Sequence, residues 1–154
     1  MHPTRMVTTL GAALAATVLA TAPAYAGNAH FIGSGMSTST SGVTLTVKFK
    51  EAGLESGSVE TIQVSAHFEG TYSCVNGGNK VPSDPKKTTI SSDVQNSGEF
   101  PAAKNGNVIG SLSVSGPDAA SVLDCPAGQK ATLFSAVFSD VVVTDLDTGA
   151  TFVF

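Results

Sequence analysis

The two cysteines, Cys74 and Cys125, have the most definite chemistry of any residues in this sequence. Cysteines either pair as a disulfide in an oxidising compartment or act as reactive thiols where a nearby cation lowers the thiol pKa. The only histidine or lysine close to either cysteine in sequence is Lys130, beyond Cys125. We therefore predict one structural disulfide, Cys74–Cys125, whose long loop stabilises the fold by about 4 kcal/mol in the chain-entropy model.

The aspartates near residue 150 suggest two further chemistries. Asp147-Thr148-Gly149-Ala150 resembles the D-T-G-A motif of retroviral-type aspartic proteases, but that reaction needs two aspartates on braced loops, and the motif lies five residues from the end of the sequence. Asp145-x-Asp147-x-Gly149 resembles the start of a twelve-residue calcium loop, whose closing glutamate would fall beyond residue 154. We predict a hairpin turn here, and weak calcium binding by Asp145 and Asp147 stays open.

Histidine and serine patterns give no support for catalysis. After the leader described next, the histidines are His30 and His67, and His67 falls on the polar face of its predicted strand. Neither has further ligands at zinc-site spacing, and the sequence contains no G-x-S-x-G elbow and no glycine-rich phosphate loop. We therefore predict no enzymatic activity, no catalytic residue, no cofactor and no metal site.

The first 26 residues have the composition of a secretory signal peptide. Arg5 precedes an apolar run of small residues over 7–22, and Ala24-Tyr25-Ala26 fits a cleavage site before Gly27. The run is short for a bilayer of about 30 Å and lacks a basic stop-transfer flank, so we expect cleavage rather than anchoring. The sequence thus predicts a signal peptide over 1–26 and one secreted, extracellular domain over 27–154.

Charge excludes two classes of partner for the mature chain. Residues 27–154 carry seven lysines and no arginine against twelve acidic residues, a net charge of −5. Binding to nucleic acid and to anionic lipid surfaces depends on basic residues, so we expect neither nucleic acid nor membrane as a partner. A chain of this length suffices for one domain that buries about two-thirds of its unfolded surface.

The clearest secondary structure is a strand over 61–74, which the rest of the fold must position. Polar residues at its odd positions alternate with apolar or small ones at even positions, which is typical of a strand with one buried face. Similar patterns predict strands over 30–36, 43–50, 87–94, 98–103, 107–115, 131–144 and 150–154. The inward residues of the 61–74 strand are Ile62, Val64, Ala66, Phe68, Gly70, Tyr72 and Cys74.

Local signals refine the connections between these strands. Residues 37–42 have the composition of a flexible Ser/Thr/Gly turn, and 51–58 of a second turn. Asn105-Gly106 predicts a type I′ turn that closes a hairpin between the strands over 98–103 and 107–115. A single helical turn is expected around 118–123.

The phenylalanines of the last two predicted strands indicate a β-bulge and the residues that face the core. Phe134, Ala136 and Phe138 are in phase, whereas the next apolar residues have the other parity, which predicts a β-bulge near Ser139-Asp140. In the final strand, Phe152 and Phe154 are expected to face the core.

These elements predict an all-β fold, specifically an antiparallel immunoglobulin-like β-sandwich of seven to eight strands with one disulfide. Tyr72-Ser73-Cys74 resembles the Y-x-C of immunoglobulin strands, but Cys74 is the earlier cysteine and the sequence contains no tryptophan. A membrane barrel would need aromatic girdles, which one tyrosine after the leader does not supply.

Three stretches resemble small secreted β-sandwich proteins of high-GC Gram-positive bacteria. They are NAHFI at 28–32, YSCVNGG at 72–78 and KNGNVIGSLSVS at 104–115. The resemblance implies export and an all-β fold, and it implies no activity.

The long connections over 75–86 and 116–130 are the candidates for binding, because long loops on a rigid sandwich often carry function. Neither contains an aromatic platform for carbohydrate. We predict a non-enzymatic extracellular module that binds an unknown protein or cell-surface ligand, or acts structurally, through these disulfide-braced loops. The alternative is a secreted protease inhibitor that presents Leu123-Asp124-Cys125-Pro126. The candidate binding residues are Asn76, Asn79, Lys80, Asp84, Lys86, Asp118, Asp124 and Gln129.

Overall fold

The strand predicted over 61–74 lies at the centre of the observed structure. A computed structural model describes residues 27–154, and the predicted signal peptide over 1–26 lies outside the described residues. The central strand is β4 (Val59–Asn76), whose 18 residues span roughly 60 Å. Every even position from Glu60 to Cys74 is buried, so the predicted alternation is confirmed.

Two antiparallel sheets form the sandwich, with eight strands in all among the described residues. In the first sheet β3 is central, with β6 on one edge and β1 and β2 sharing the other. The second sheet has the order β5-β4-β7-β8. The predicted all-β sandwich is therefore confirmed. The first sheet comprises β1 (His30–Phe31), β2 (Ser37–Ser41), β3 (Thr44–Ala52) and β6 (Val108–Ser115), and β4 is joined in the second by β5 (Lys87–Pro101), β7 (Gln129–Asp145) and β8 (Thr151–Val153).

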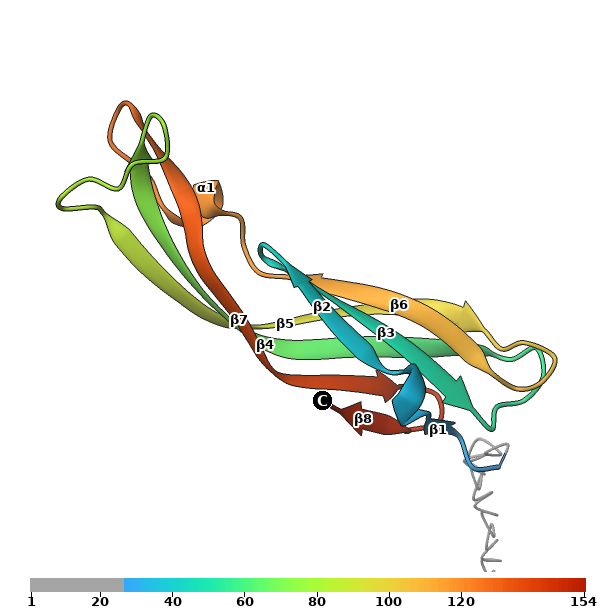
Figure 1. Cartoon of the computed structure of the whole chain (residues 1–154). Helices are drawn as coiled ribbons and strands as arrows, with labels where there is room; N and C mark the ends of the chain where they lie inside the picture. The colour runs from blue at the N-terminus through green and yellow to red at the C-terminus, as the bar shows by residue number, and fades with distance from the viewer. Residues whose placement is uncertain (1–26) are drawn as a thin grey trace, which may run out of the picture.

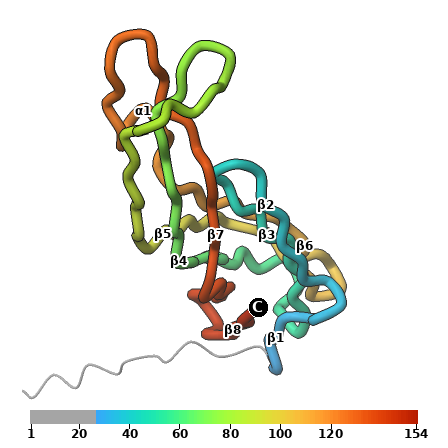
Figure 2. The backbone as a smooth tube through the Cα atoms, turned by 60° about the vertical axis from the view of Figure 1, so that its left-hand side comes forward, coloured from blue at the N-terminus to red at the C-terminus, as the bar shows by residue number. Residues whose placement is uncertain are grey.

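The molecule is elongated because β4, β5 and β7 extend well beyond the edge of the first sheet. Figure 1 shows β4, β5 and β7 leaving the sandwich as a curved three-stranded arm, and the rotated view in Figure 2 shows the same arm rising from the two packed sheets. The segment with α1 (Ala119–Val122) packs against the arm in place of the missing sheet. A 3-10 turn, η1 (Gly33–Gly35), separates β1 from β2.

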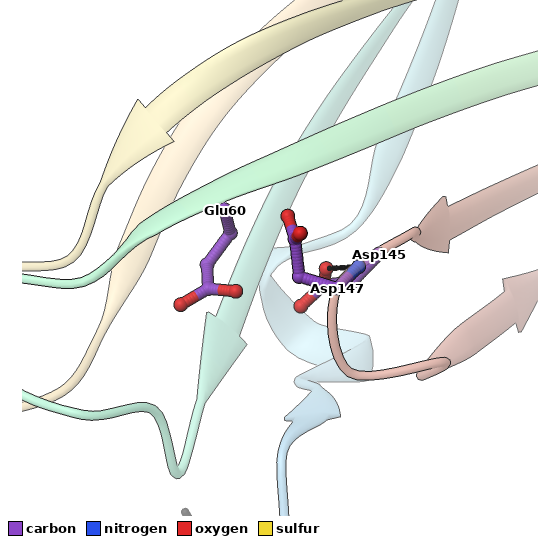
Figure 3. Close-up of side chains that lie close together, drawn as sticks. All are labelled: Glu60, Asp145 and Asp147. Atoms are coloured by element: carbon purple, nitrogen blue, oxygen red, sulfur yellow. Dashed lines mark hydrogen bonds between the residues drawn. The ribbon is translucent and has the colours of Figure 1, made fainter. Parts of the chain in front are cut away.

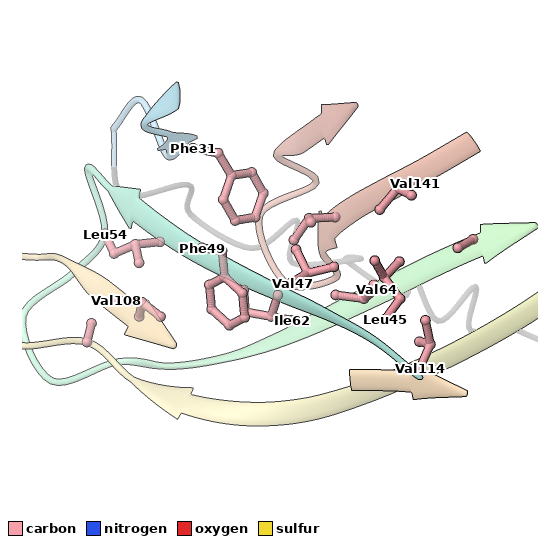
Figure 4. Packing of buried hydrophobic residues seen from close by; sticks show 13 residues of the cluster. Phe31, Leu45, Val47, Phe49, Leu54, Ile62, Val64, Val108, Val114 and Val141 are labelled. Carbon is pink, nitrogen blue, oxygen red and sulfur yellow. The ribbon is translucent and has the colours of Figure 1, made fainter. Parts of the chain in front are cut away.

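Buried side chains form one apolar cluster in the sandwich and another in the arm. In the sandwich, Leu45, Val47 and Phe49 of β3 pack with Ile62 and Val64 of β4 (Figure 4), each 2% exposed or less. Burying a side chain of this size stabilises the fold by about 1.5–3 kcal/mol. The arm core, which we define by its buried members, consists of Phe68, Tyr72, Cys74 and Leu123.

At the junction between the two clusters, the backbone of Gly116 packs directly against the ring of Phe68. Gly116 lies directly after β6, and a Cβ at Gly116 would come within 2.4 Å of that ring. Glycine is therefore required by packing at this position.

Several predictions about the connections are wrong. Residues 37–42 contain a strand, β2, which pairs with β3 from Ser37↔Lys48 to Ser41↔Thr44. All five β2 residues are exposed, so apolar alternation could not mark it. The strands predicted over 87–94 and 98–103 form one continuous strand, β5, because its exposed polar middle stays paired with β4.

A turn forms at Asn105-Gly106, with Gly106 at φ +69°, but Asn105 does not have a positive φ, so the predicted type I′ turn is wrong. The turn also does not close the predicted hairpin. β5 lies in the second sheet and β6 in the first, so the turn crosses between sheets. The β3–β4 connection holds it there, because the Leu54 N–H donates to the Gly106 carbonyl at 3.1 Å. Contacts from a distant segment thus override the local hairpin signal.

Strand β7 contains the predicted bulge and a second one. The register with β4 shifts between Ser65 and His67, opposite Asp140 at φ +50°, which confirms the bulge near Ser139-Asp140. A further shift between Thr71 and Tyr72 was not predicted. It turns Phe134 outward, 51% exposed, so the prediction that Phe134 is in phase with Ala136 and Phe138 is wrong.

The inward placement of Phe154 is also wrong. Its side chain is 45% exposed because it lies beyond β8, where its ring packs edge-on against Phe152 with centroids 5.0 Å apart.

Candidate functional site

Polar side chains that could bind a ligand gather at the two ends of the molecule. One end is the arm tip, which we define as residues 75–86 and 123–130 (Figure 1). The other is the carboxylate cluster, which we define as Glu51, Glu60, Asp145 and Asp147; three of these side chains are shown in Figure 3. The first end was a candidate from the sequence, whereas at the second the sequence singled out Asp145 and Asp147 but not Glu51 and Glu60.

The predicted disulfide Cys74–Cys125 is present at the base of the arm tip. The two Cα atoms lie 5.7 Å apart, and Cys74 is fully buried. Its backbone N–H donates to the Lys86 carbonyl at 2.9 Å. The predicted disulfide therefore joins the end of β4 to the connection between α1 and β7.

Five of the predicted loop residues stabilise the arm tip itself. Asn76, Asn79 and Lys80 make the turn after β4, in which the Asn76 N–H donates to the Lys80 carbonyl at 2.8 Å. The Lys86 ammonium donates to the Asp124 carbonyl at 2.7 Å, which links the two loops. Asp84 is exposed in the first loop, and Gln129 begins β7 opposite Asn76.

Asp118 lies away from the arm tip, at the start of α1. Its carbonyl accepts the Ser121 hydroxyl at 2.7 Å. Nearby, the buried Tyr72 hydroxyl donates to the Pro117 carbonyl at 2.6 Å. Burial, with the charge of Asp118, raises the pKa of Tyr72. Asp118 therefore belongs to the helix that covers the arm core and not to the loop surface.

A shallow pocket of about 430 Å³ opens on the arm beside these loops. Its apolar part includes Leu133 and the half-exposed Phe134, and its polar part includes Asn79 and Lys130. Of the eight predicted binding residues, only Asn79 lines this pocket. Sequence reasoning missed Phe134 because its outward orientation depends on the unpredicted register shift in β7.

A serine, a histidine and an acid meet on the outer face of β4 and β5. His67 Nδ1 lies 2.7 Å from Asp93 Oδ1, and His67 Nε2 lies 2.9 Å from the Ser91 hydroxyl. This is the order of groups in a hydrolytic triad. The Asp93 side chain is 91% exposed, however, and the adjoining pocket is not lined by Ser91. The geometry describes a surface hydrogen-bond network whose acid is open to solvent.

The turn between β7 and β8 orients two carboxylates. One oxygen of Asp145 accepts the Asp147 N–H at 2.8 Å, and the other accepts the Thr148 hydroxyl at 2.7 Å. Gly149 closes the turn at φ +80°. The predicted hairpin turn over 145–149 is therefore confirmed, with Asp145 as the residue whose side chain holds its backbone.

Glu60, at the start of β4, faces this turn. Carboxylate oxygens of Glu60, Asp145 and Asp147 all lie within 4.8 Å of one another. The Ser58 hydroxyl donates to Glu60, and the Thr61 N–H donates to Asp147 at 2.6 Å. Glu60 is 5% exposed and Asp145 is fully buried, whereas Asp147 is exposed, so the group opens to solvent on one side.

Glu51 completes the carboxylate cluster from β3. Its side chain is fully buried, and no N–H or hydroxyl group lies within hydrogen-bond distance of either carboxylate oxygen. Burial raises the pKa of Glu51 to about 8, and the charge of Asp145, a hydrogen bond between the Glu51 and Asp145 carboxyls and the charge of Glu60 add to the shift. The sequence placed Glu51 in a turn, although it continues the inward parity of the preceding apolar residues of β3.

Comparison of the chain with protein-family models, with curated proteins and with solved structures finds no match in any of the three. The resemblance to small secreted proteins of Gram-positive bacteria therefore stays a prediction. No helix within residues 27–154 is both long enough and apolar enough to span a membrane.

Proposed function

We propose that residues 27–154 form a secreted, non-enzymatic β-sandwich that binds an extracellular protein or cell-surface ligand at the arm tip and the adjoining pocket formed by β7 residues 130–134. The observation that carries the proposal is the pocket of about 430 Å³ in which Phe134 and Leu133 lie beside Lys130. Exposed aromatic residues next to a cation are characteristic of protein-binding surfaces. The disulfide and the link between Lys86 and Asp124 hold this surface in one conformation before a ligand arrives.

Charge suggests the chemistry of the ligand. The arm tip carries three lysines against two aspartates, although residues 27–154 are acidic as a whole. A segment that presents an acidic group next to an apolar one fits both Lys130 and the phenylalanine. Secretion is supported by the disulfide and by the leader-like composition of residues 1–26.

The immunoglobulin-like type of sandwich is part of the same proposal. The strand orders β2-β3-β6 and β5-β4-β7-β8 correspond to strands A-B-E and C′-C-F-G of immunoglobulin-like domains. In this assignment β1 and β2 share the place of strand A. In variable-type domains the binding loops include B–C and F–G, which in this assignment are residues 53–58 and 146–150 at the opposite end. The architecture therefore does not select the arm tip, and the pocket alone carries the proposal.

A capture experiment with matched variants tests the arm tip. The immobilised mature protein is incubated with culture medium and with cell-wall extract of the producing cells, beside Phe134→Ser and Ile109→Ser. Ile109 is 74% exposed on β6, away from the arm, and serves as the control. We expect a component retained by the wild type and Ile109→Ser and lost with Phe134→Ser. Equal retention by all three proteins, or by none, contradicts the proposal.

The protease-inhibitor alternative has weaker support. Leu123, which would be presented to the protease, is 6% exposed and belongs to the arm core. The Asp124 carbonyl is already bonded to Lys86. Incubation with common serine proteases tests it, because stoichiometric inhibition would favour this alternative over a binding module.

A further inference from the structure

We propose that Glu51, Glu60, Asp145 and Asp147 form a binding site for one calcium ion at the end of the sandwich opposite the arm tip. This inference is independent of the proposed binding at the arm tip, because it rests on different residues in a different part of the molecule.

The spacing of the carboxylates fits a cation of this size. Calcium binds oxygen ligands at about 2.3–2.6 Å, so two of its ligands lie at most about 5 Å apart. One oxygen from each of Glu60, Asp145 and Asp147 lies within 4.8 Å of the other two (Figure 3), and Glu51 joins this group of three through its contact with Asp145. The three come from the start of β4, the end of β7 and the turn that follows β7. This turn is attached to β4 by a hydrogen bond in which the Leu146 N–H donates to the Thr61 carbonyl at 2.9 Å.

Glu51 is an independent observation that points to a ligand. A buried carboxylate without a hydrogen bond is strongly unfavourable, and native proteins rarely leave both of its oxygens without partners. Glu51 is fully buried, no N–H or hydroxyl group bonds either of its oxygens, and its carboxyl adjoins that of Asp145. A cation between these side chains pairs the two carboxylates when both are ionised.

No protein cation neutralises the cluster. Among residues 27–154, the only ion pair within 4.0 Å is His67–Asp93, which lies on the outer face of β4 and β5. When all four are ionised, carboxylates brought together without a lysine or arginine repel one another, and a divalent ion removes this repulsion.

The donor set selects the kind of metal. Carboxylate oxygens without histidine or cysteine favour a hard cation, calcium or magnesium, over zinc. Magnesium requires a near-ideal octahedron at about 2.0–2.1 Å, whereas calcium accepts irregular sites of six to eight oxygens. Asp145 and Asp147 are already fixed by hydrogen bonds, and the exposed side at Asp147 admits water as the remaining ligands. These features favour calcium.

The ligands lie 9, 85 and 2 residues apart along the chain, at positions 51, 60, 145 and 147. This spacing differs from the contiguous twelve-residue calcium loop, so the site depends on the packing of β3 against β4 and β7.

Calorimetric titration with metal alone tests the proposal. The mature protein is freed of metal with EDTA, dialysed, and titrated with CaCl2 and separately with MgCl2. We expect one calcium per chain, tighter than magnesium, and a rise in the thermal midpoint of roughly 10 °C at 100 times Kd. Glu51→Gln and Asp145→Asn should each weaken calcium binding at least about tenfold, whereas Glu55→Gln, an exposed glutamate in the next turn, should not.

The contrary results are equally specific. No binding heat and no midpoint shift at millimolar calcium would overturn the site, as would unchanged calcium affinity in Glu51→Gln. Magnesium binding as tight as calcium would overturn the assignment of the ion. Circular dichroism confirms that each variant is folded, and Glu60→Gln replaces Asp145→Asn if the turn does not form.

Discussion

Replacing Glu51 with glutamine should change how stability depends on pH in the cation-free protein. Burial, with the charges of Asp145 and Glu60, raises the pKa of Glu51 from 4.5 to about 8, and Asp147 is the remaining charged group of the cluster. Between these two pKa values the folded state holds a proton that the unfolded state lacks. The unfolding free energy contributed by Glu51 is therefore fully present below about pH 4.5 and falls as pH rises through about 8.

The magnitude follows from the size of the pKa shift. Each pKa unit corresponds to about 1.36 kcal/mol, so wild type should lose about 3–4 kcal/mol between about pH 5 and about pH 8. That is a large share of the 5–15 kcal/mol that typically stabilises a domain. Glu51→Gln cannot ionise, and its other titrating groups are those of the wild type, so the difference between the two proteins isolates this one carboxyl.

Guanidinium unfolding in EDTA, followed by circular dichroism across this pH range, measures the effect. We expect the stability of wild type to fall relative to Glu51→Gln as pH rises. The control Glu55→Gln should follow wild type, since Glu55 is exposed. Parallel pH profiles for wild type and Glu51→Gln would refute the reasoning, because they would show that folding does not raise this pKa.

Three further predictions concern other parts of the fold. Removing the disulfide with Cys74→Ser and Cys125→Ser, 51 residues apart, should lower the unfolding free energy by about 4 kcal/mol in guanidinium titrations, and a loss below about 1 kcal/mol would contradict its role. Gly116→Ala should cost about 1–3 kcal/mol by the same measurement, because its Cβ overlaps an arm-core ring, whereas Gly77→Ala, with open space around it, should be within about 0.5 kcal/mol of wild type. Assays with small activated esters should show equal, background rates for wild type and Ser91→Ala, and a rate lost in Ser91→Ala would indicate a hydrolase.

The parts of the fold that sequence predicts well are those in which one strand faces both core and solvent. Strict alternation placed β4 and the buried face of β3, and the change of parity after Phe138 located the bulge at Asp140. The disulfide followed from the presence of only two cysteines in a chain predicted to be exported. The alternation and the change of parity are local patterns that can be read from a single sequence, and the disulfide follows from counting the cysteines.

The failures share a different cause, which is that a distant segment decides the outcome. Strand β2 has no apolar face, and only its pairing with β3 defines it. The Gly106 turn joins two sheets because Leu54 holds it, and Phe134 faces outward because of a register shift against β4.

The carboxylate cluster was only half predictable for the same reason. Asp145 and Asp147 stand out as neighbours in sequence, whereas Glu51 and Glu60 reach them only through the packing of three strands. The inward parity of Glu51 with Leu45, Val47 and Phe49 was the one local signal that could have identified it.

We propose that Glu51 completes a cation site with the other three carboxylates. An NMR titration of EDTA-treated protein (residues 27–154) with CaCl2 tests this most directly. We predict that the amide signals of Glu51, Glu60 and residues 145–148 shift and saturate at one calcium per chain, while those of the arm tip stay in place. Shifts confined to other surface acids, such as Asp93 and Asp140, or no saturable shift at all, would contradict the claim.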